Sequence, residues 1–235
     1  MMDVRHNMVC LAAGLLAGLA GVASRAQADA IVAMTDWNDG SLANWSENQA
    51  WVTIANPGSG GITNSGFLQV TLDETDPLNE GLGEEWYSLV QVSAADFFTG
   101  EWKTNQWFEF NLWASNTTPD YVQVRWSADP GRVWRDTVFD SLYDNMGTQS
   151  WEHLRSSALT DYSSWDYGGG TQEQFLNDLA AIDWVGVFIW RDGAGLQVYG
   201  IDDFALMVPE PSEWLLLAVA GVISRNACRR KRKPC

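Results

Sequence analysis

Residues 107–126 read WFEFNLWASNTTPDYVQVRW, and this stretch decides the fold class. Apolar side chains occupy every second position in each half: Phe108, Phe110 and Leu112, then Val122, Val124 and Trp126. A period of two is typical of β-strands that bury one face. The seven residues 114–120 between the halves suit a hairpin loop. We therefore predict two antiparallel strands, 107–113 and 121–125, paired with each other.

The same alternation continues on both sides of this stretch. It is clear in residues 68–72, where Leu68, Val70 and Leu72 alternate with polar residues. Further strands are predicted near residues 31–36, 51–55, 87–92, 133–139, 151–159, 184–191 and 196–206. Both sets of positions in 184–191 are apolar, which predicts a strand buried on both faces. Clusters of Asn, Asp, Pro and Gly separate the segments, as turns require.

One helix is predicted after the glycines at 168–170. Thr171 followed three residues later by Gln174 is the pattern of a capping box. The apolar stripe of this helix is expected to consist of Phe175, Leu176, Leu179 and Ala180. Many short strands with one short inserted helix predict an all-β fold, a two-sheet antiparallel β-sandwich of jelly-roll type.

Residues 1–28 have the pattern of a secretory signal peptide. Arg5 and His6 form a short polar head, an apolar run covers residues 9–23, and Ala26 and Ala28 frame a signal-peptidase site. The alternative is an uncleaved anchor helix, although the apolar run is shorter than the ~20 residues that a span requires. We predict a signal helix that signal peptidase removes during export across the inner membrane.

Residues 208–235 form a second terminal unit. Pro209, Glu210 and Pro211 keep the backbone extended, so a protease can reach it. An apolar stretch at 214–223 and a basic run at 229–233 follow. The apolar run gives about 15 Å of helix against a hydrocarbon core of ~30 Å. This predicts a C-terminal hydrophobic helix that inserts into the membrane transiently; a chance amphipathic tail is the alternative.

The order of these three parts resembles the PEP-CTERM sorting signal, which exosortase enzymes of some Gram-negative envelopes recognise. The resemblance covers about residues 208–233, and the short apolar run departs from the pattern. It implies that an exosortase-type enzyme processes the tail. It also implies a location in the cell envelope, at the cell surface or in the extracellular matrix of a Gram-negative-type bacterium.

The middle of the chain is strongly acidic. Residues 29–208 hold 27 acidic and six basic side chains, a net charge of −21. This charge opposes binding to nucleic acid, and it favours the attraction of divalent cations. Cys10, Cys228 and Cys235 all lie in the terminal segments. The predicted domain, residues 29–207, therefore has no disulfide and no thiol nucleophile.

Two short stretches of the middle, DWNDG at 36–40 and YGIDDF at 199–204, resemble the first and last strands of jelly-roll carbohydrate-binding modules and galactose-binding-like domains. In those families the two strands lie side by side and often share a structural calcium ion. The resemblance implies a terminal ligand at Asp202, with Asn38 at a position where glutamate is commoner. Further oxygen ligands would be Asp36, Asp39 and Asp203. Solvated acids at strand ends are the alternative, so no cofactor is required.

The outward positions of the two predicted paired strands suit a sugar ligand. They are Trp107, Glu109, Asn111, Trp113, Tyr121, Gln123 and Arg125. Sugar C–H faces stack on aromatic rings, and sugar hydroxyls need fixed donors and acceptors. We therefore predict a non-catalytic domain that binds polysaccharide. The alternative is a structural matrix protein with no ligand site, in which Trp107 and Trp113 are buried.

Signals for catalysis are weak. His153 is the only histidine of the middle, and no Gly-x-Ser-x-Gly elbow accompanies it. Glycosidases need two carboxylates at about 5–10 Å, and Glu84, Glu85 and Glu101 beside tryptophans are the candidates. We predict that the protein is not an enzyme; a concanavalin-like glycan hydrolase is the remaining alternative.

Overall fold

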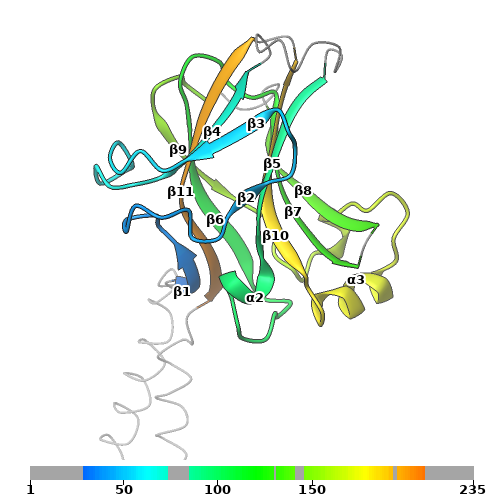
Figure 1. Ribbon diagram of the computed structural model, residues 1–235. Coiled ribbons are helices and arrows are strands. Elements are labelled where there is room, and N and C mark those ends of the chain that lie inside the picture. Colours follow the sequence, from blue (N-terminus) through cyan, green and yellow to red (C-terminus); the bar gives the residue numbers. More distant parts are fainter. Residues whose placement is uncertain (1–28, 74–84, 130, 141–145, 193–194, 210–235) are drawn as a thin grey trace, which may run out of the picture. The chain divides into compact units, whose positions relative to one another are not determined.

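The structure is a computed structural model that describes residues 29–73, 85–129, 131–140, 146–192 and 195–209 (Figure 1). The predicted signal helix and the C-terminal hydrophobic helix lie outside these residues, as do Ala26, Ala28, Glu210 and Pro211. Within the described ranges, no helix combines the length and apolar character that crossing a bilayer needs.

Two antiparallel sheets make up the domain. Sheet A has the order β3 (Val52–Ala55), β4 (Leu68–Asp73), β11 (Leu196–Pro209), β6 (Trp107–Ala114) and β9 (Trp151–Arg155), and β1 (Asp29–Thr35) also pairs with β11. Sheet B has the order β2 (Ser46–Glu47), β5 (Glu85–Ser93), β10 (Trp184–Asp192), β7 (Tyr121–Asp129) and β8 (Arg132–Asp140). The two sheets form the two layers of the domain in Figure 1. The predicted all-β, two-sheet antiparallel sandwich is confirmed.

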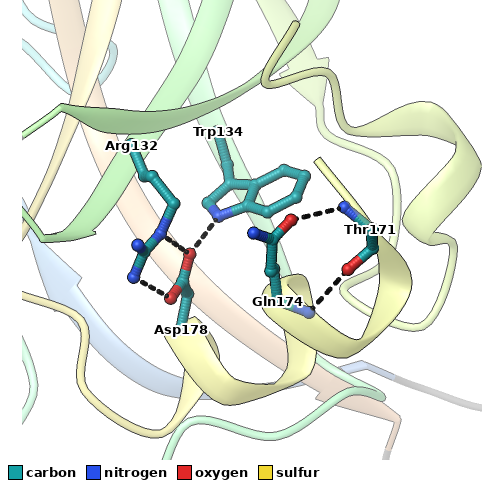
Figure 2. A network of polar contacts seen from close by, with 5 residues as sticks. All are labelled: Arg132, Trp134, Thr171, Gln174 and Asp178. Atoms are coloured by element: carbon teal, nitrogen blue, oxygen red, sulfur yellow. Dashed lines mark hydrogen bonds and ion pairs between the residues drawn. The ribbon is translucent and has the colours of Figure 1, made fainter. Parts of the chain in front are cut away.

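Within the described residues, three short helical segments accompany the sheets: α2 (Ala94–Phe97), the 3-10 helix η2 (Tyr162–Ser164) and α3 (Gln172–Leu179). The predicted capping box begins α3, because Gln174 N donates to Thr171 Oγ1 at 3.2 Å and Thr171 N donates to Gln174 Oε1 at 2.9 Å (Figure 2). Phe175 and Leu179 are buried as predicted. Leu176 and Ala180 are exposed, so the apolar stripe is narrower than predicted.

The hydrophobic core lies between the two sheets and takes alternate residues from each. Sheet A contributes Leu68, Val70, Leu72, Phe108, Phe110, Leu112, Tyr199, Ile201, Phe204 and Leu206; sheet B contributes Val90, Val92, Val122, Val124, Trp126, Val185, Val187 and Ile189. Tryptophan side chains contribute much of the buried volume of the domain. Six described tryptophans are buried: Trp37, Trp45, Trp107, Trp126, Trp134 and Trp165. Burial of these rings accounts for much of the high tryptophan content.

The first and last strands lie side by side, as the family resemblance implied. β1 pairs antiparallel with β11, and Thr35 is the register partner of Phe204. The ladder between β11 and β6 has an irregularity between Asp202 and Ala205, where Asp203 adopts a positive φ of 51°. β11 continues to Pro209, which pairs with Asp29, so the strand extends two residues past the predicted domain end at 207.

Candidate functional site

The predicted pairing of β6 with β7 is wrong, because the two strands belong to different sheets. β6 pairs with β11 and β9 in sheet A, whereas β7 pairs with β10 and β8 in sheet B. The connection between them crosses from one layer to the other: Ser115 N donates to Val198 O of β11, and Asp120 N donates to Trp190 O of β10. The seven predicted ligand residues therefore lie on opposite outer faces of the sandwich.

The sheet A half of the predicted site is occupied by contacts within the protein. Trp107 is buried, and its Nε1 donates to Glu109 Oε1 at 2.7 Å. The guanidinium of Arg155 lies 4.1 Å from the ring centroid of Trp107. Glu109 also forms an ion pair with Arg155 at 3.7 Å, and its Oε2 lies 3.5 Å from His153 Nε2. Few polar groups are left at this end of sheet A for a ligand.

The other two residues of that half are likewise engaged. Trp113 is half-buried and packs against Phe67 and Trp151, with ring centroids 6.4 Å apart in both pairs. Asn111 Nδ2 donates to Asp203 Oδ2 at 3.4 Å. The alternative that these tryptophans pack within the fold is correct for Trp107 and partly correct for Trp113.

The outer face of sheet B carries a different set of side chains. β10 is the central strand of this sheet, and Val185, Val187 and Ile189 point into the core. Phe188 and Trp190 alternate with them and lie on the outer face, where Trp190 is half-buried. The prediction that β10 is buried on both faces is therefore confirmed for Phe188 and wrong for Trp184 and Trp190, which are half-buried.

Register brings aromatic residues of three strands together on this face. Trp190 pairs with Tyr121 of β7 and with Tyr87 of β5. The ring centroids of Tyr121 and Trp190 are 5.0 Å apart, those of Tyr121 and Phe188 are 5.8 Å apart, and those of Tyr87 and Phe188 are 5.2 Å apart. All three pairs are stacked, with interplanar angles of 19° to 28°. Both tyrosines are half-buried, so this row is partly open to solvent.

Polar side chains of β7 adjoin the aromatic row. Arg125 Nε and Nη2 donate to Gln123 Oε1 at 2.9 and 2.7 Å, and Gln123 Nε2 donates to Thr137 Oγ1 at 3.2 Å. The guanidinium of Arg125 lies 3.4 Å from the ring centroid of Phe188, which is cation–π geometry. We define the sheet B platform as Tyr87, Tyr121, Gln123, Arg125, Phe188 and Trp190.

A pocket of about 440 Å³ adjoins the platform at β8. It is lined by Gln123, Arg135, Asp136, Thr137, Ser157, Ser164 and Asp166. Burial raises the pKa of Asp136, whereas a hydrogen bond from Gly168 N and the charge of Arg135 lower that of Asp166. The pocket shares the side chain of Gln123 with the platform, and its lining is polar.

The predicted calcium ligands lie around the β1–β11 ladder. Asp202 is buried, and its Oδ1 and Oδ2 accept from Asp203 N at 2.9 Å and Ile62 N at 3.0 Å. Burial raises the pKa of Asp202, and the charges of Asp203 and Asp36 raise it further. Asp36 and Asp203 are half-buried nearby, so three predicted carboxylates repel one another in this region.

The predicted calcium set does not assemble as a whole. Asn38 and Asp39 are exposed, and Asp39 Oδ1 accepts from Ser41 N at 2.8 Å. Among the residues that the structure describes, no three His, Cys, Asp or Glu side chains come close enough to hold a metal ion. Ca²⁺ prefers six to eight oxygens. Calcium binding stays a prediction.

The structure describes two of the candidate catalytic side chains, Glu101 and His153. Glu84 lies outside the described residues, as does the side chain of Glu85. Glu101 is exposed and lies 4.0 Å from Lys103. His153 is largely exposed beside Glu109. Within the described part of the chain, none of these groups forms a carboxylate pair in a pocket.

Known structures resemble the domain, although no family model and no curated protein matches the chain. One is a carbohydrate-binding module of the β-sandwich superfamily that was studied for its promiscuous specificity. It has a TM-score of 0.50 and 13% identity, over 73% of this chain and 60% of that chain. The domain has the β-sandwich fold of carbohydrate-binding modules.

Two further structures are similar in the same way. An exo-β-agarase matches with a TM-score of 0.50 and 12% identity, over 76% of this chain and 25% of the agarase. The CBM22-1 xylan-binding domain of Paenibacillus barcinonensis Xyn10C matches with a TM-score of 0.47 and 12% identity, over 80% and 99% of the two chains. At such identities the likeness concerns the fold, and function has to be argued from the site.

Proposed function

We propose that the domain binds polysaccharide on the sheet B platform without cleaving it. The observation that carries the proposal is the partly exposed row of Tyr87, Tyr121 and Trp190, bordered by the side chains of Gln123 and Arg125. Aromatic surface offers contact to sugar C–H groups, while the amide and the guanidinium offer hydrogen bonds to hydroxyls.

The outer face of sheet B suits this function better than that of sheet A. On sheet A the indole of Trp107 is buried beneath Arg155, and Glu109 forms an ion pair with Arg155 and lies next to His153. On sheet B the aromatic rings come from three adjacent strands, which lie about 5 Å apart, so the contact surface extends across the strands.

Substituting Trp190 tests the proposal. We expect the Trp190→Ala variant of the full-length protein to bind neutral or charged polysaccharides at least tenfold more weakly, about 1.4 kcal/mol, because the platform loses its largest open ring. Affinity electrophoresis through gels containing xylan, mixed-linkage β-glucan, agarose or polygalacturonate measures the effect.

Trp151→Ala is the matched control, since Trp151 is a half-buried tryptophan on the edge strand of the other sheet. Its affinity should stay within twofold of the wild type, with thermal melts establishing that both variants are folded. Equal affinities of the wild type and the Trp190→Ala variant would reject the platform. A wild type that binds no polysaccharide would reject carbohydrate binding.

We further propose that this domain works outside the inner membrane, at the cell surface or in the matrix. The supporting features are the signal-peptide pattern of residues 1–28, the PEP-CTERM-like residues 208–233 and the absence of cysteine between them. Signal peptidase and an exosortase-type enzyme would then be the processing partners. Intact-mass measurement of the protein recovered from native cells should show loss of both ends; recovery of the unclipped chain from cytosol would refute export.

A further inference from the structure

Arg125 differs from the other basic side chains of the domain. Residues 29–209 contain six bases, and five of them have a carboxylate partner within 4.0 Å: Lys103, Arg132, Arg135, Arg155 and Arg191. Arg125 has no such partner among the described residues. With 27 acids available in residues 29–208, an arginine without a carboxylate is unexpected on composition alone.

The surroundings of Arg125 make its isolated charge costly. The side chain is half-buried, and its hydrogen bonds go to the neutral amide of Gln123. Arg135 is its register partner on β8, so two like charges stand directly opposite each other, which is destabilising in an antiparallel pair. Burial and the charge of Arg135 lower the pKa of Arg125 to about 10. A negatively charged ligand group at this position would offset both the burial of the Arg125 charge and its repulsion by Arg135.

Arg125 also has N–H groups that make no hydrogen bond to the described residues and can bind a ligand. A guanidinium carries five N–H groups, and Nε and one N–H of Nη2 are used by Gln123. Nη1 has no acceptor among the described residues. Stacking on Phe188 holds the guanidinium plane in place beside the row of Tyr121 and Trp190. A fixed planar fork of this kind matches the two oxygens of a carboxylate or sulfate group.

We propose that the sheet B platform recognises an anionic polysaccharide, and that Arg125 pairs with a carboxylate or sulfate group of its sugar units. This inference rests on the proposed function, because it names the class of polysaccharide bound at that surface. The net charge of −21 repels polyanions at long range. At about 0.15 M salt the Debye length is ~8 Å, so distant carboxylates are screened and the local pair dominates.

The test compares polymers that share a backbone and differ in whether that backbone carries anionic groups. Polygalacturonate is paired with its fully methyl-esterified form, and dextran sulfate is paired with dextran. Full-length protein at 0.15 M salt should bind at least one charged polymer at least tenfold more tightly than its neutral counterpart. A preference within the first pair identifies the carboxylate, and a preference within the second identifies the sulfate.

Arg125→Gln keeps hydrogen-bonding capacity but removes the charge, and it should reduce the preference to less than threefold. Arg155→Gln is the matched control: it makes the same charge change at an arginine over an aromatic ring on sheet A, and it should retain the preference. Melting curves establish that both variants are folded.

The outcomes separate this inference from the proposed function. Equal binding of charged and neutral polymers overturns the anionic preference while polysaccharide binding stands. A preference that survives in Arg125→Gln, or that is lost equally in Arg155→Gln, overturns the assignment to Arg125. Failure of the folded wild type to bind any polymer of either panel overturns both proposals.

Discussion

Replacing Asp178 with alanine is expected to lower the free energy of unfolding by about 3 kcal/mol. Asp178 is 4% exposed and connects α3 to β8. Its carboxylate accepts from Arg132 Nε at 2.9 Å and Nη2 at 2.8 Å, and from Trp134 Nε1 at 2.9 Å (Figure 2). The alanine variant leaves a buried indole N–H and a partly buried guanidinium without this acceptor, which costs more than the pair contributes when intact. Urea unfolding at neutral pH measures the loss.

The cost of losing Asp178 should depend on pH. Burial alone would raise the pKa of Asp178, but the hydrogen bonds from Arg132 and Trp134 outweigh it, and the pKa in the folded state lies below its ordinary value. Stability from such a group is present above the unfolded pKa of about 3.9 and is lost as the pH falls through the folded pKa. The difference between wild type and Asp178→Asn should therefore shrink below about pH 4.

Asn177→Ala is the control for this prediction, because Asn177 is an exposed neighbour on the same helix. Its unfolding free energy should stay within about 0.5 kcal/mol of the wild type. An Asp178→Ala variant no less stable than Asn177→Ala would mean that this network does not hold α3 against sheet B.

Local patterns predicted the strands because each pattern reports one property of its own segment. The alternation of Phe108, Phe110 and Leu112 shows which face of a strand is buried, whatever strand lies beside it. The capping box at Thr171 and Gln174 involves residues three apart, so it is visible in the sequence. β2 was missed because its two residues are too short to show a period.

Strand pairing could not be predicted in the same way. The connection 115–120 is compatible with a hairpin or with a crossing between layers, and the buried faces of β6 and β7 are the same in both cases. The predicted hairpin would have placed all seven predicted ligand residues on one surface, whereas the crossing between layers places them on two. Tyr87 and Trp190 lie 103 residues apart in sequence, and the register of β5 with β10 brings them together. The sequence analysis therefore did not place Tyr87 and Trp190 in the ligand site, because their proximity depends on that register.

The partners of charged side chains were also beyond the sequence. Arg132 pairs with the carboxylate of Asp178, which is 46 residues away in the sequence. The numbers of acidic and basic residues could not show that Arg125 lacks a carboxylate partner among the described residues. The alternating aromatic residues of 184–191 carried a usable signal. Phe188 is buried on the outer face as predicted, but Trp190 on the same face is half-buried, so the alternation alone did not show where burial ends along β10.

The largest loss of stability is expected at Phe204. This side chain is fully buried on β11 next to the irregularity of the ladder. Its ring centroid lies 5.1 Å from that of Trp45, 5.3 Å from Phe97, 5.6 Å from Phe108 and 5.8 Å from Phe110. Phe204→Ala removes the ring that these four share, so a cavity and lost aromatic contacts combine to cost about 4 kcal/mol.

A comparison of Phe204→Leu with Phe204→Ala tests whether the loss of stability comes from cavity formation. Phe204→Leu keeps most of the apolar volume and should cost about 1–2 kcal/mol, because the leucine leaves a smaller cavity. Equal losses for leucine and alanine would point to backbone rearrangement at the neighbouring Asp203, whose φ is 51°, instead of cavity formation.

Phe204 belongs to sheet A and the platform to the outer face of sheet B. The fraction of either variant that stays folded should therefore bind polysaccharide with wild-type affinity, and weakened binding by folded Phe204→Leu would contradict the assignment of the ligand to sheet B.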